Sequence, residues 1–381
     1  MPAFITGLGV CLPNEPISND RIESVLGVVN GRSPRVKDMI LTRNGINTRH
    51  YVIDPATGRQ THTNAQLTAE SVHTLAENCD LDLDTIDLLG CGTSLPDQLI
   101  PNHACMVHGL LGCPPCELVS TSGVCCAGMT ALKYGYLSVA SGASRNAVIT
   151  GSETASLGML AKYLRCSRWT EHDVEKSPHL AFEHEFLRWM LSDGAGAVLI
   201  EPRPRANAIS LRIDWLDILS FANELETCMY AGAVKAEDGS LRTWREIDNL
   251  DHVWKDGYFS IGQDVRLLNE NIVSNAMRRS FERVRAKREL TPDGVDWLLP
   301  HLSSYFFQQP IHDALASMDF AIPYEKWFTN LDKKGNTGSA SLFIMLEELW
   351  ASGRLKRGER ILCAVPESAR FTFAYLQLTV V

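Results

Sequence analysis

The feature that most constrains the fold of this chain is an internal repeat, because its two halves carry the same features in the same order. Four of these features recur at offsets of 209 to 214 residues: a turn after a strand-like segment, the start and the end of an apolar helical stretch, and a strand that leads to a glutamate. The equivalent pairs are Gly92 and His301, Cys126 and Asn336, Ala140 and Ala351, and Glu153 and Glu367. Short apolar segments also match by chance, but the shared order favours a duplicated fold with pseudo-twofold symmetry.

Strand-like apolar segments alternate with longer helical stretches, which predicts an α/β architecture. The clearest break between the two halves is the segment Pro202-Arg203-Pro204-Arg205, because its prolines interrupt regular secondary structure. We therefore expect one half at 1–203 and the other at 204–381. The strand candidates are 4–10, 88–92, 147–151, 197–201, 361–365 and 371–381.

The composition excludes several classes of protein. The 381 residues are 45% hydrophobic, which rules out a disordered or collagen-like chain. Acidic residues outnumber basic ones by 45 to 36, and no long run of Lys or Arg occurs, so nucleic acid is not the expected partner. No stretch approaches the roughly 18 apolar residues of a membrane span, and residues 1–6 lack the form of a signal peptide. We expect a cytoplasmic protein, without membrane contact, whose eleven cysteines are reduced.

Cys126 is the leading candidate for a nucleophile. It opens an apolar helical stretch, and the N–H groups and dipole of a helix N-terminus lower the pKa of a thiol. Gly123 and Gly128 allow a substrate or a backbone segment to approach closely. The alternative is a small core residue, as free cysteine usually is. We expect the neighbouring Cys125 to belong to the core, because adjacent residues on a helix face different directions.

His301 and Asn336 are candidate partners of Cys126. His301 follows the buried strand-like segment 297–300, and Asn336 precedes a helical stretch at the position that is equivalent to Cys126. Ligands of α/β sheets bind beyond the carboxyl ends of strands and near helix N-termini, so the three side chains are expected to converge. A nucleophile, a proton acceptor and a neutral donor would then lie together. A structural histidine and a capping asparagine are the alternatives.

A second group of ligand-type residues precedes Cys126. Its members are His103, Cys105, His108, Cys113 and Cys116. The pair in Cys113-Pro114-Pro115-Cys116 has the two-residue spacing of zinc sites and redox motifs. No second pair of this kind follows, and helix packing accounts for Cys105. We therefore expect no metal, with structural zinc as the less favoured alternative.

Taken together, these residues resemble the thiolase superfamily, specifically the ketoacyl-ACP synthase III-like condensing enzymes. The matching motifs occur in the order of that family between residues 42 and 341. They are Thr42-Arg43-Asn44-Gly45-Ile46 with Arg49, Val124-Cys125-Cys126-Ala127-Gly128, Asp193-Gly194-Ala195-Gly196-Ala197-Val198, Leu298-Leu299-Pro300-His301, and Gly335-Asn336-Thr337-Gly338-Ser339-Ala340-Ser341.

The resemblance implies a thiolase-like, five-layered α-β-α-β-α fold, a homodimer, and transfer of an acyl group from a thioester to Cys126. His301 and Asn336 would bind the carbonyl of a second thioester and assist formation of its carbanion. The backbone N–H groups of Cys126 and Ala369 would form an oxyanion hole. Arg43 and Arg49 would belong to the segment where substrate enters. Acyl-ACP or acyl-CoA would be the substrate, acyl carrier protein the partner, and no cofactor would be needed.

Several departures from the family pattern favour a carrier-bound substrate in a specialised pathway. Met39 stands where an aromatic residue often stacks on coenzyme A, and 366–372 replaces a glycine-rich turn. This last segment and 186–193 resemble the bacterial ketosynthase/cyclases of dialkylresorcinol and stilbene biosynthesis. Those enzymes join a β-ketoacyl thioester to an acyl thioester and close a cyclohexanedione ring.

Ring closure would use an additional base, for which Glu153 and Glu367 are candidates if burial raises the pKa. An ordinary ion pair or helix cap is the alternative for each. The insertion 156–190 is expected to shape an acyl pocket or the dimer interface.

Three functions stay open at this point. The first is a Claisen condensation that forms a C–C bond. The second is an acyltransferase that passes the acyl group from cysteine to an oxygen or nitrogen nucleophile. The third is a non-catalytic subunit that stabilises an active partner.

Overall fold

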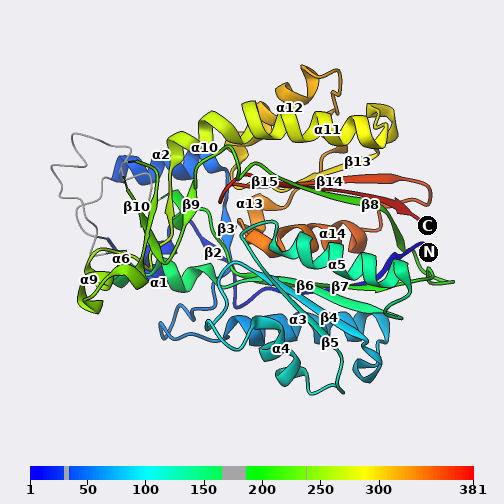
Figure 1. Cartoon of the computed structure of the whole chain (residues 1–381), viewed down its shortest axis with the longest axis horizontal. Coiled ribbons are helices and arrows are strands. Elements are labelled where there is room, and N and C mark those ends of the chain that lie inside the picture. Colours follow the sequence, from blue (N-terminus) through cyan, green and yellow to red (C-terminus); the bar gives the residue numbers. More distant parts are fainter. Residues whose placement is uncertain (30–33, 165–185, 237) are drawn as a thin grey trace.

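The computed structural model describes residues 1–29, 34–164, 186–236 and 238–381 (Figure 1). The strands of the principal sheet are β1 Phe4–Cys11, β4 Leu88–Thr93, β5 Glu117–Ser122, β6 Ala147–Glu153, β7 Gly194–Glu201, β8 Leu211–Ser220, β13 Trp297–Pro300, β14 Arg360–Glu367 and β15 Thr372–Val380. The shorter strands are β2 Ile17–Ser18, β3 Thr48–Arg49, β9 Met229–Tyr230, β10 Ala233–Lys235, β11 Leu241–Thr243 and β12 Gly262–Gln263.

The α-helices are α1 Ile22–Leu26, α2 Pro34–Asn44, α3 Asn64–Cys79, α4 His103–Leu111, α5 Ala127–Ser141, α6 Ala161–Leu164, α9 Leu250–Lys255, α10 Val265–Asn271, α11 Arg278–Arg288, α12 Gln308–Ala316, α13 Leu331–Lys334 and α14 Ser341–Ala351. A π-helix, Ile272–Met277, continues α10 into α11. Short 3₁₀ turns include Gly338–Ala340, which leads into α14. No helix among the described residues has the length and apolar character to cross a membrane.

The order of strands in the principal sheet repeats one arrangement in both halves, except that β5 has no counterpart among the described strands of the second half. In the first half the order is β1-β7-β6-β4-β5, with β4 parallel to β5 and β6, and with β7 antiparallel to β1 and β6. In the second half the order is β8-β15-β14-β13, with β13 parallel to β14 and with β15 antiparallel to β8 and β14. The two sets join through a short antiparallel pairing of β1 with β8. This topology confirms the predicted duplication of an α/β unit.

The halves stack as five layers (Figure 1). The helices α3 and α4 cover the outer face of β4, β6 and β7, and α11 and α12 cover the outer face of β8, β14 and β15. The helices α5 and α14 fill the middle layer between the two sets of strands, where the apolar core is continuous. Because β7 ends at Glu201 and β8 begins at Leu211, the chain crosses between the sets at the segment proposed as the boundary of the halves.

Two strands of the sheet were not among those predicted from sequence. The strand β5 lies at the edge of the sheet, and most of its residues are exposed or half-buried, so it lacks a continuous apolar run. The strand β8 alternates buried residues with polar ones over its first half. Neither strand has the continuous apolar run by which a strand is predicted from sequence. Each is identified only by its pairing with a neighbouring strand in the structure.

A close backbone approach in the middle layer sets the position of the segment before α14. A Cβ atom on Gly151 of β6 would lie 2.3 Å from the carbonyl oxygen of Ser339. Only glycine therefore allows the 3₁₀ turn 338–340 to lie directly on the sheet. This contact brings the end of β6 beside residues 336–339.

Candidate active site

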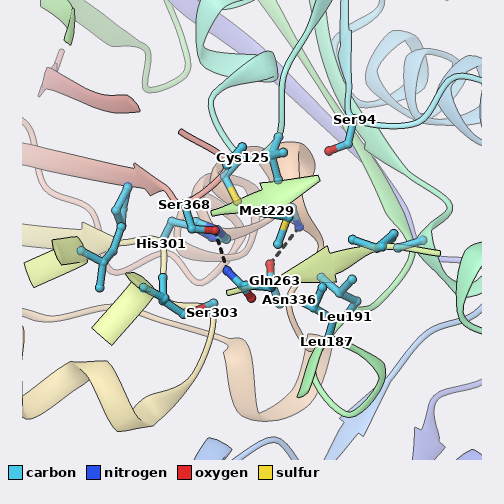
Figure 2. A pocket seen from close by; sticks show the side chains of 18 of the residues that line it. Ser94, Cys125, Leu187, Leu191, Met229, Gln263, His301, Ser303, Asn336 and Ser368 are labelled. Atoms are coloured by element: carbon cyan, nitrogen blue, oxygen red, sulfur yellow. Dashed lines mark hydrogen bonds between the residues drawn. The ribbon is translucent and has the colours of Figure 1, made fainter. Parts of the chain in front are cut away.

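A cavity of about 330 Å³ lies where the carboxyl ends of β6 and β13 meet the segments that precede α5 and α14 (Figure 2). Cys125, Glu153, His301 and Asn336 all line it. Three of the four were singled out from sequence, and the fourth is the neighbour of the predicted nucleophile. Two halves of the chain thus supply the reactive groups to one space, as the repeat predicts.

His301 begins directly after β13 and is almost fully buried. Its backbone N–H donates to the carbonyl of Ala364, which ties it to the neighbouring strand β14. Burial lowers the pKa of the imidazole to about 4, so the ring is neutral at physiological pH. The buried Nε2 atom has no hydrogen-bond partner among the described residues. An unpaired polar atom of this kind is costly unless a ligand uses it, which makes Nε2 available to a substrate.

The backbone N–H and the backbone carbonyl of Asn336 both form hydrogen bonds. Its N–H donates to the carbonyl of Met190, and its carbonyl accepts from the N–H of Ser192. The side-chain Oδ1 accepts from the N–H of Gly338 at 3.0 Å. With its oxygen held in this way, the amide has its Nδ2 donors left for a carbonyl oxygen in the cavity.

The two adjacent cysteines are both buried, and their thiols have different surroundings. The Sγ atom of Cys126 donates to the carbonyl of Val365 at 3.3 Å and lies 3.7 Å from that of Thr372, so its thiol faces the β14–β15 hairpin. Cys125 lines the cavity (Figure 2). Val124 and Gly123 line it as well, and Cys126 does not. Cys125 is buried in the core, as predicted, and it also lines the cavity, whereas the Cys126 thiol lies against the β14–β15 hairpin.

The expectation of a lowered thiol pKa is wrong. Burial raises the pKa of both cysteines well above its usual value, and the carboxylate of Glu367 adds to the effect. For Cys125, Glu153 contributes as well. The helix N-terminus should lower the pKa of a thiol, but desolvation and the nearby carboxylates disfavour the thiolate more strongly. Cys125 is therefore a neutral thiol at rest, and its activation needs a proton acceptor.

Glu367 lies outside the cavity, although its neighbours Pro366 and Ser368 line it. Its Oε2 accepts from the backbone N–H groups of Val124 and Cys126, each at 2.9 Å. Burial raises the pKa of this carboxyl, and the two N–H donors oppose that rise. The Cys126 N–H, which was expected in the oxyanion hole, is thus occupied by Glu367. Among the described residues, the N–H groups of Cys125 and Ala369 donate no hydrogen bond, and both residues line the cavity.

Glu153 ends β6 and lines the cavity. Its Oε1 accepts from the hydroxyl of Ser94 at 2.6 Å, and from the N–H groups of Ser94 and Ser339 at 3.1 and 3.2 Å. Burial raises its pKa to about 7, although these hydrogen bonds favour the charged form. Such a carboxyl is close to half-ionised at neutral pH, which suits a general base.

The arginines of the expected entrance segment lie apart from the cavity. Arg43 is exposed near the end of α2, and Arg49 is fully buried. The Arg49 guanidinium donates to Asn19 Oδ1 and to the carbonyl of Trp189, and burial lowers its pKa. These contacts fit a structural role for Arg49 better than contact with an entering substrate.

The remaining cavity wall is mostly apolar, and sequence patterns did not identify it. It comes largely from α10, the π-helix, α12 and the segment before β7, and it includes Leu187, Leu191, Leu268, Ile272, Val273, Met277, Phe307 and Ile311. Leu187 belongs to the insertion 156–190, of which residues 165–185 lie outside the described part. In the sequence, apolar side chains that line a cavity have the same periodicity as core residues. Only the tertiary structure therefore distinguishes cavity-lining residues from core residues.

Comparisons with known proteins find similar sequences and similar folds. Residues 286–365 match the family described as 3-oxoacyl-[acyl-carrier-protein (ACP)] synthase III C terminal. The chain is 25% identical to the beta-ketoacyl-[acyl-carrier-protein] synthase III of Xanthomonas campestris pv. campestris, over 94% of this chain and 92% of that protein. The corresponding synthase of Methylococcus capsulatus is 24% identical, over 94% and 93%.

Solved structures show the same fold. The tetronic acid condensing enzyme AbyA1 superposes with a TM-score of 0.75 and 18% identity, covering 99% of both chains. A cysteine-to-serine variant of OleA from Xanthomonas campestris, with bound lauric acid and lauroyl-CoA, superposes with a TM-score of 0.74 and 18% identity, covering 100% of this chain and 99% of that one. The chain is therefore similar over most of its length to the 3-oxoacyl-[acyl-carrier-protein] synthase III condensing enzymes, which are acyltransferases, and it has their thiolase-like fold.

Proposed function

We propose that this chain forms a C–C bond by Claisen condensation and that Cys125, rather than Cys126, carries the first acyl group. The observation that carries the proposal is the single cavity lined by the Cys125 thiol, the His301 imidazole and the Asn336 amide. The reaction is the one expected from the sequence. The nucleophile moves by one residue, because the Cys126 thiol is enclosed by the β14–β15 hairpin.

In the first step, the Cys125 sulfur attacks the carbonyl of an acyl thioester. A bond forms between Sγ and the acyl carbon, and the bond from that carbon to the carrier sulfur breaks. The thiol proton passes to the neutral His301 ring and from there to the departing carrier thiolate. The backbone N–H groups of Cys125 and Ala369 serve as oxyanion donors in place of the Cys126 N–H, since Glu367 occupies the latter.

In the second step, His301 Nε2 and Asn336 Nδ2 hold the carbonyl oxygen of the second thioester while its α-carbon becomes a carbanion. The carbanion forms by loss of CO₂ or by proton transfer to Glu153, and it attacks the acyl carbon on Cys125. The new C–C bond replaces the C–S bond, and the Cys125 thiolate takes a proton from Glu153 or, where the carbanion formed by loss of CO₂, from solvent. The orphaned Nε2 atom and the held amide support this arrangement.

A β-ketoacyl thioester is the second substrate that these groups favour. Its α-proton is acidic enough for a carboxylate to remove, and Glu153 is poised with a pKa of about 7. The same base can act again on the joined product, which closes a cyclohexanedione ring of the dialkylresorcinol type. Glu367 is not placed for this task, because its carboxylate is held by two backbone donors outside the cavity.

The apolar wall binds the acyl chain in this proposal. Ile272, Val273 and Met277 all come from the π-helix between α10 and α11. A π-helix widens the turn and is found mostly at functional sites. Its position supports a role for these three side chains in setting the acyl length.

Acyl carrier protein is the proposed partner, and a homodimer is the proposed assembly. The strand β5 lies at the edge of the sheet, and the apolar residues Leu99, Ile100 and Leu110 are exposed. An edge strand of this kind favours pairing with a second chain. The division at 203 and a cytoplasmic location stay predictions from the sequence.

The test is intact-protein mass spectrometry after incubation with acyl-CoA and acyl-ACP thioesters. We expect the wild-type chain to gain one acyl mass and Cys125→Ala to gain none. Cys126→Ser is the matched control, because its hydroxyl can still donate to the Val365 carbonyl, and it should be acylated like the wild type. Adding a β-ketoacyl thioester should then release a C–C-joined product.

Acylation of Cys125→Ala, together with loss of acylation in Cys126→Ser, would return the nucleophile to Cys126. An ester or amide product would favour the acyltransferase alternative. No acylation of any variant, with unchanged pathway flux in Cys125→Ala, would favour a non-catalytic subunit.

A further inference from the structure

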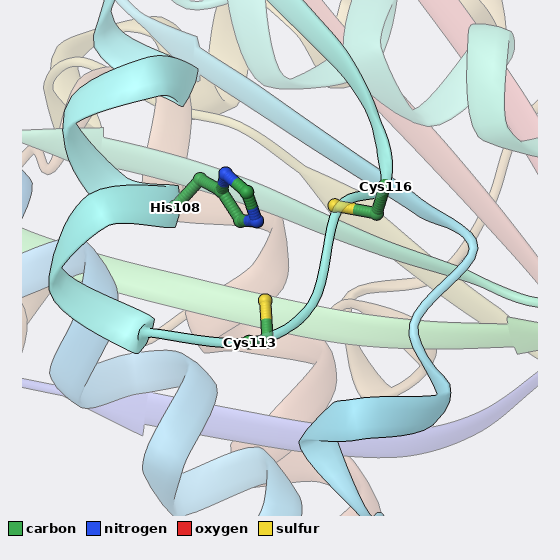
Figure 3. A group of neighbouring side chains, drawn as sticks. All are labelled: His108, Cys113 and Cys116. Atoms are coloured by element: carbon green, nitrogen blue, oxygen red, sulfur yellow. The ribbon is translucent and has the colours of Figure 1, made fainter.

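Three ligand-type side chains outside the active site lie together at the end of α4 (Figure 3). His108 belongs to the last turns of α4, and Cys113 and Cys116 belong to the segment that leads into β5. Their ligand atoms all lie within 4.8 Å of one another. None of the three residues lines the active-site cavity.

The two other members of the group singled out from sequence stand apart. His103 is buried, and its Nε2 contacts the hydroxyls of Thr68 and Ser152. Cys105 is exposed near the start of α4. The structure therefore selects His108, Cys113 and Cys116 from a group that spacing alone could not divide.

The backbone holds the three groups in place without a ligand. Gly112 ends α4 with a φ of +65° and donates its N–H to the carbonyl of His108, which reverses the chain. Pro114 and Pro115 then restrict the backbone between the two cysteines. The resulting turn presents both sulfur atoms to the edge of the His108 ring (Figure 3). Little conformational entropy is left to lose on binding, which favours affinity.

The chemistry of the three groups suits a divalent cation of borderline softness. Two thiolates and one imidazole bind Zn²⁺ in proteins where a solvent molecule or substrate takes the fourth position. The Nε2 atom of His108 lies 3.1 Å from the carbonyl oxygen of Pro114, so its proton is held there until a cation replaces it. Cys113 is buried, while His108 and Cys116 are half-buried, so an ion can reach the site from solvent.

We propose that His108, Cys113 and Cys116 bind one Zn²⁺ ion, with solvent as the fourth ligand, and that this ion ties the end of α4 to the start of β5. The zinc has a structural role. It holds the start of the edge strand β5 in place, and the chain continues from β5 through Gly123 to Cys125. It takes no part in acyl transfer. This inference stands independently of the proposed reaction.

The test uses the full chain, freed of metal with a chelator under reducing conditions, and titrated with Co²⁺. We expect one Co²⁺ per chain, with thiolate-to-cobalt charge-transfer bands and the absorption of a tetrahedral site, and displacement by one equivalent of Zn²⁺. His108→Ala, Cys113→Ser and Cys116→Ser should each weaken binding at least tenfold. Zn²⁺ should raise the melting temperature of the wild type and not of these variants.

Two matched controls locate the metal. Cys105→Ser removes a nearby exposed thiol of α4, and Cys125→Ala removes the thiol in the cavity, so both should bind Co²⁺ like the wild type. If a site variant does not fold, X-ray absorption of the zinc-loaded wild type should show two sulfur ligands and one imidazole.

Three results would overturn the proposal. One is the absence of stoichiometric Co²⁺ binding, and another is loss of binding in Cys125→Ala with retention in Cys116→Ser. The third is a Cys113–Cys116 disulfide that persists in the reduced preparation, which would make the pair a covalent link instead of a metal site.

Discussion

Replacing Glu153 by glutamine tests the electrostatics of the active site most directly. The carboxyl is fully enclosed, and burial raises its pKa from 4.5 to about 7. Glutamine has the same shape and stays neutral, and its side-chain oxygen can still accept from Ser94 and Ser339. The substitution therefore removes the charge and keeps the packing.

The sign and size of the effect follow from proton linkage. The folded chain holds a proton on Glu153 between pH 4.5 and 7 that the unfolded chain has already lost. The stabilising contribution is thus fully present below pH 4.5, and it is lost as the pH rises through 7. Over the interval from pH 5 to pH 8, this amounts to about 2–3 kcal/mol of unfolding free energy. His301, with its lowered pKa, has the opposite slope, but it is present in both proteins and cancels in the difference.

The assay is urea unfolding of the wild type and Glu153→Gln between pH 5 and pH 8. The unfolding free energy of the wild type should fall by about 2–3 kcal/mol relative to that of the variant over this range. Glu77→Gln, at an exposed position on α3, is the control and should follow the wild type. Parallel curves for the wild type and Glu153→Gln would refute the raised pKa, and with it the role of Glu153 as a base near neutrality.

Three further substitutions probe the same cavity. Gly338→Ala would place a Cβ 2.8 Å from Glu153 Cγ at a φ of +53°, so we expect a loss of about 1–2 kcal/mol in urea unfolding; an unchanged midpoint would contradict the close approach. Asn336→Ala should leave acylation of Cys125 intact and slow condensation by about 10²–10³-fold; equal loss in mass-spectrometric acylation and in product formation would contradict the assigned step. Ile272→Phe narrows the apolar wall, so competition between acyl thioesters should shift toward shorter chains by about tenfold per methylene; an unchanged preference would mean that the acyl chain lies elsewhere.

The sequence predicted the fold well because the relevant signals are periodic and repeated. The order of strands, turns and helix starts recurs in both halves, and the sheet shows the same pairing pattern twice. The positions of His301 and Asn336 followed from this order, since each stands just after a strand or just before a helix. Glu153 followed in the same way from the end of β6.

The cysteine assignment could not be obtained in this manner. The offsets of the repeat vary by several residues, so either Cys125 or Cys126 satisfies it. The pKa expectation failed for a related reason: the helix N-terminus is visible in the sequence, but the carboxylate of Glu367 and the covering strands are not. The sequence also could not separate the apolar residues of the cavity wall from those of the core. In the same way, it could not separate His108, Cys113 and Cys116 from the other histidines and cysteines nearby.

By itself, the sequence determined the duplicated α/β architecture and the kinds of groups that meet at its centre, because these depend on local order and spacing. Only the tertiary structure decided which of two adjacent thiols faces the cavity. That choice depends on a hairpin far along the chain, whose carbonyls accept from Cys126 and whose glutamate occupies its N–H. Packing against this distant hairpin decides which of the two adjacent side chains faces the cavity. A local sequence pattern does not contain that information.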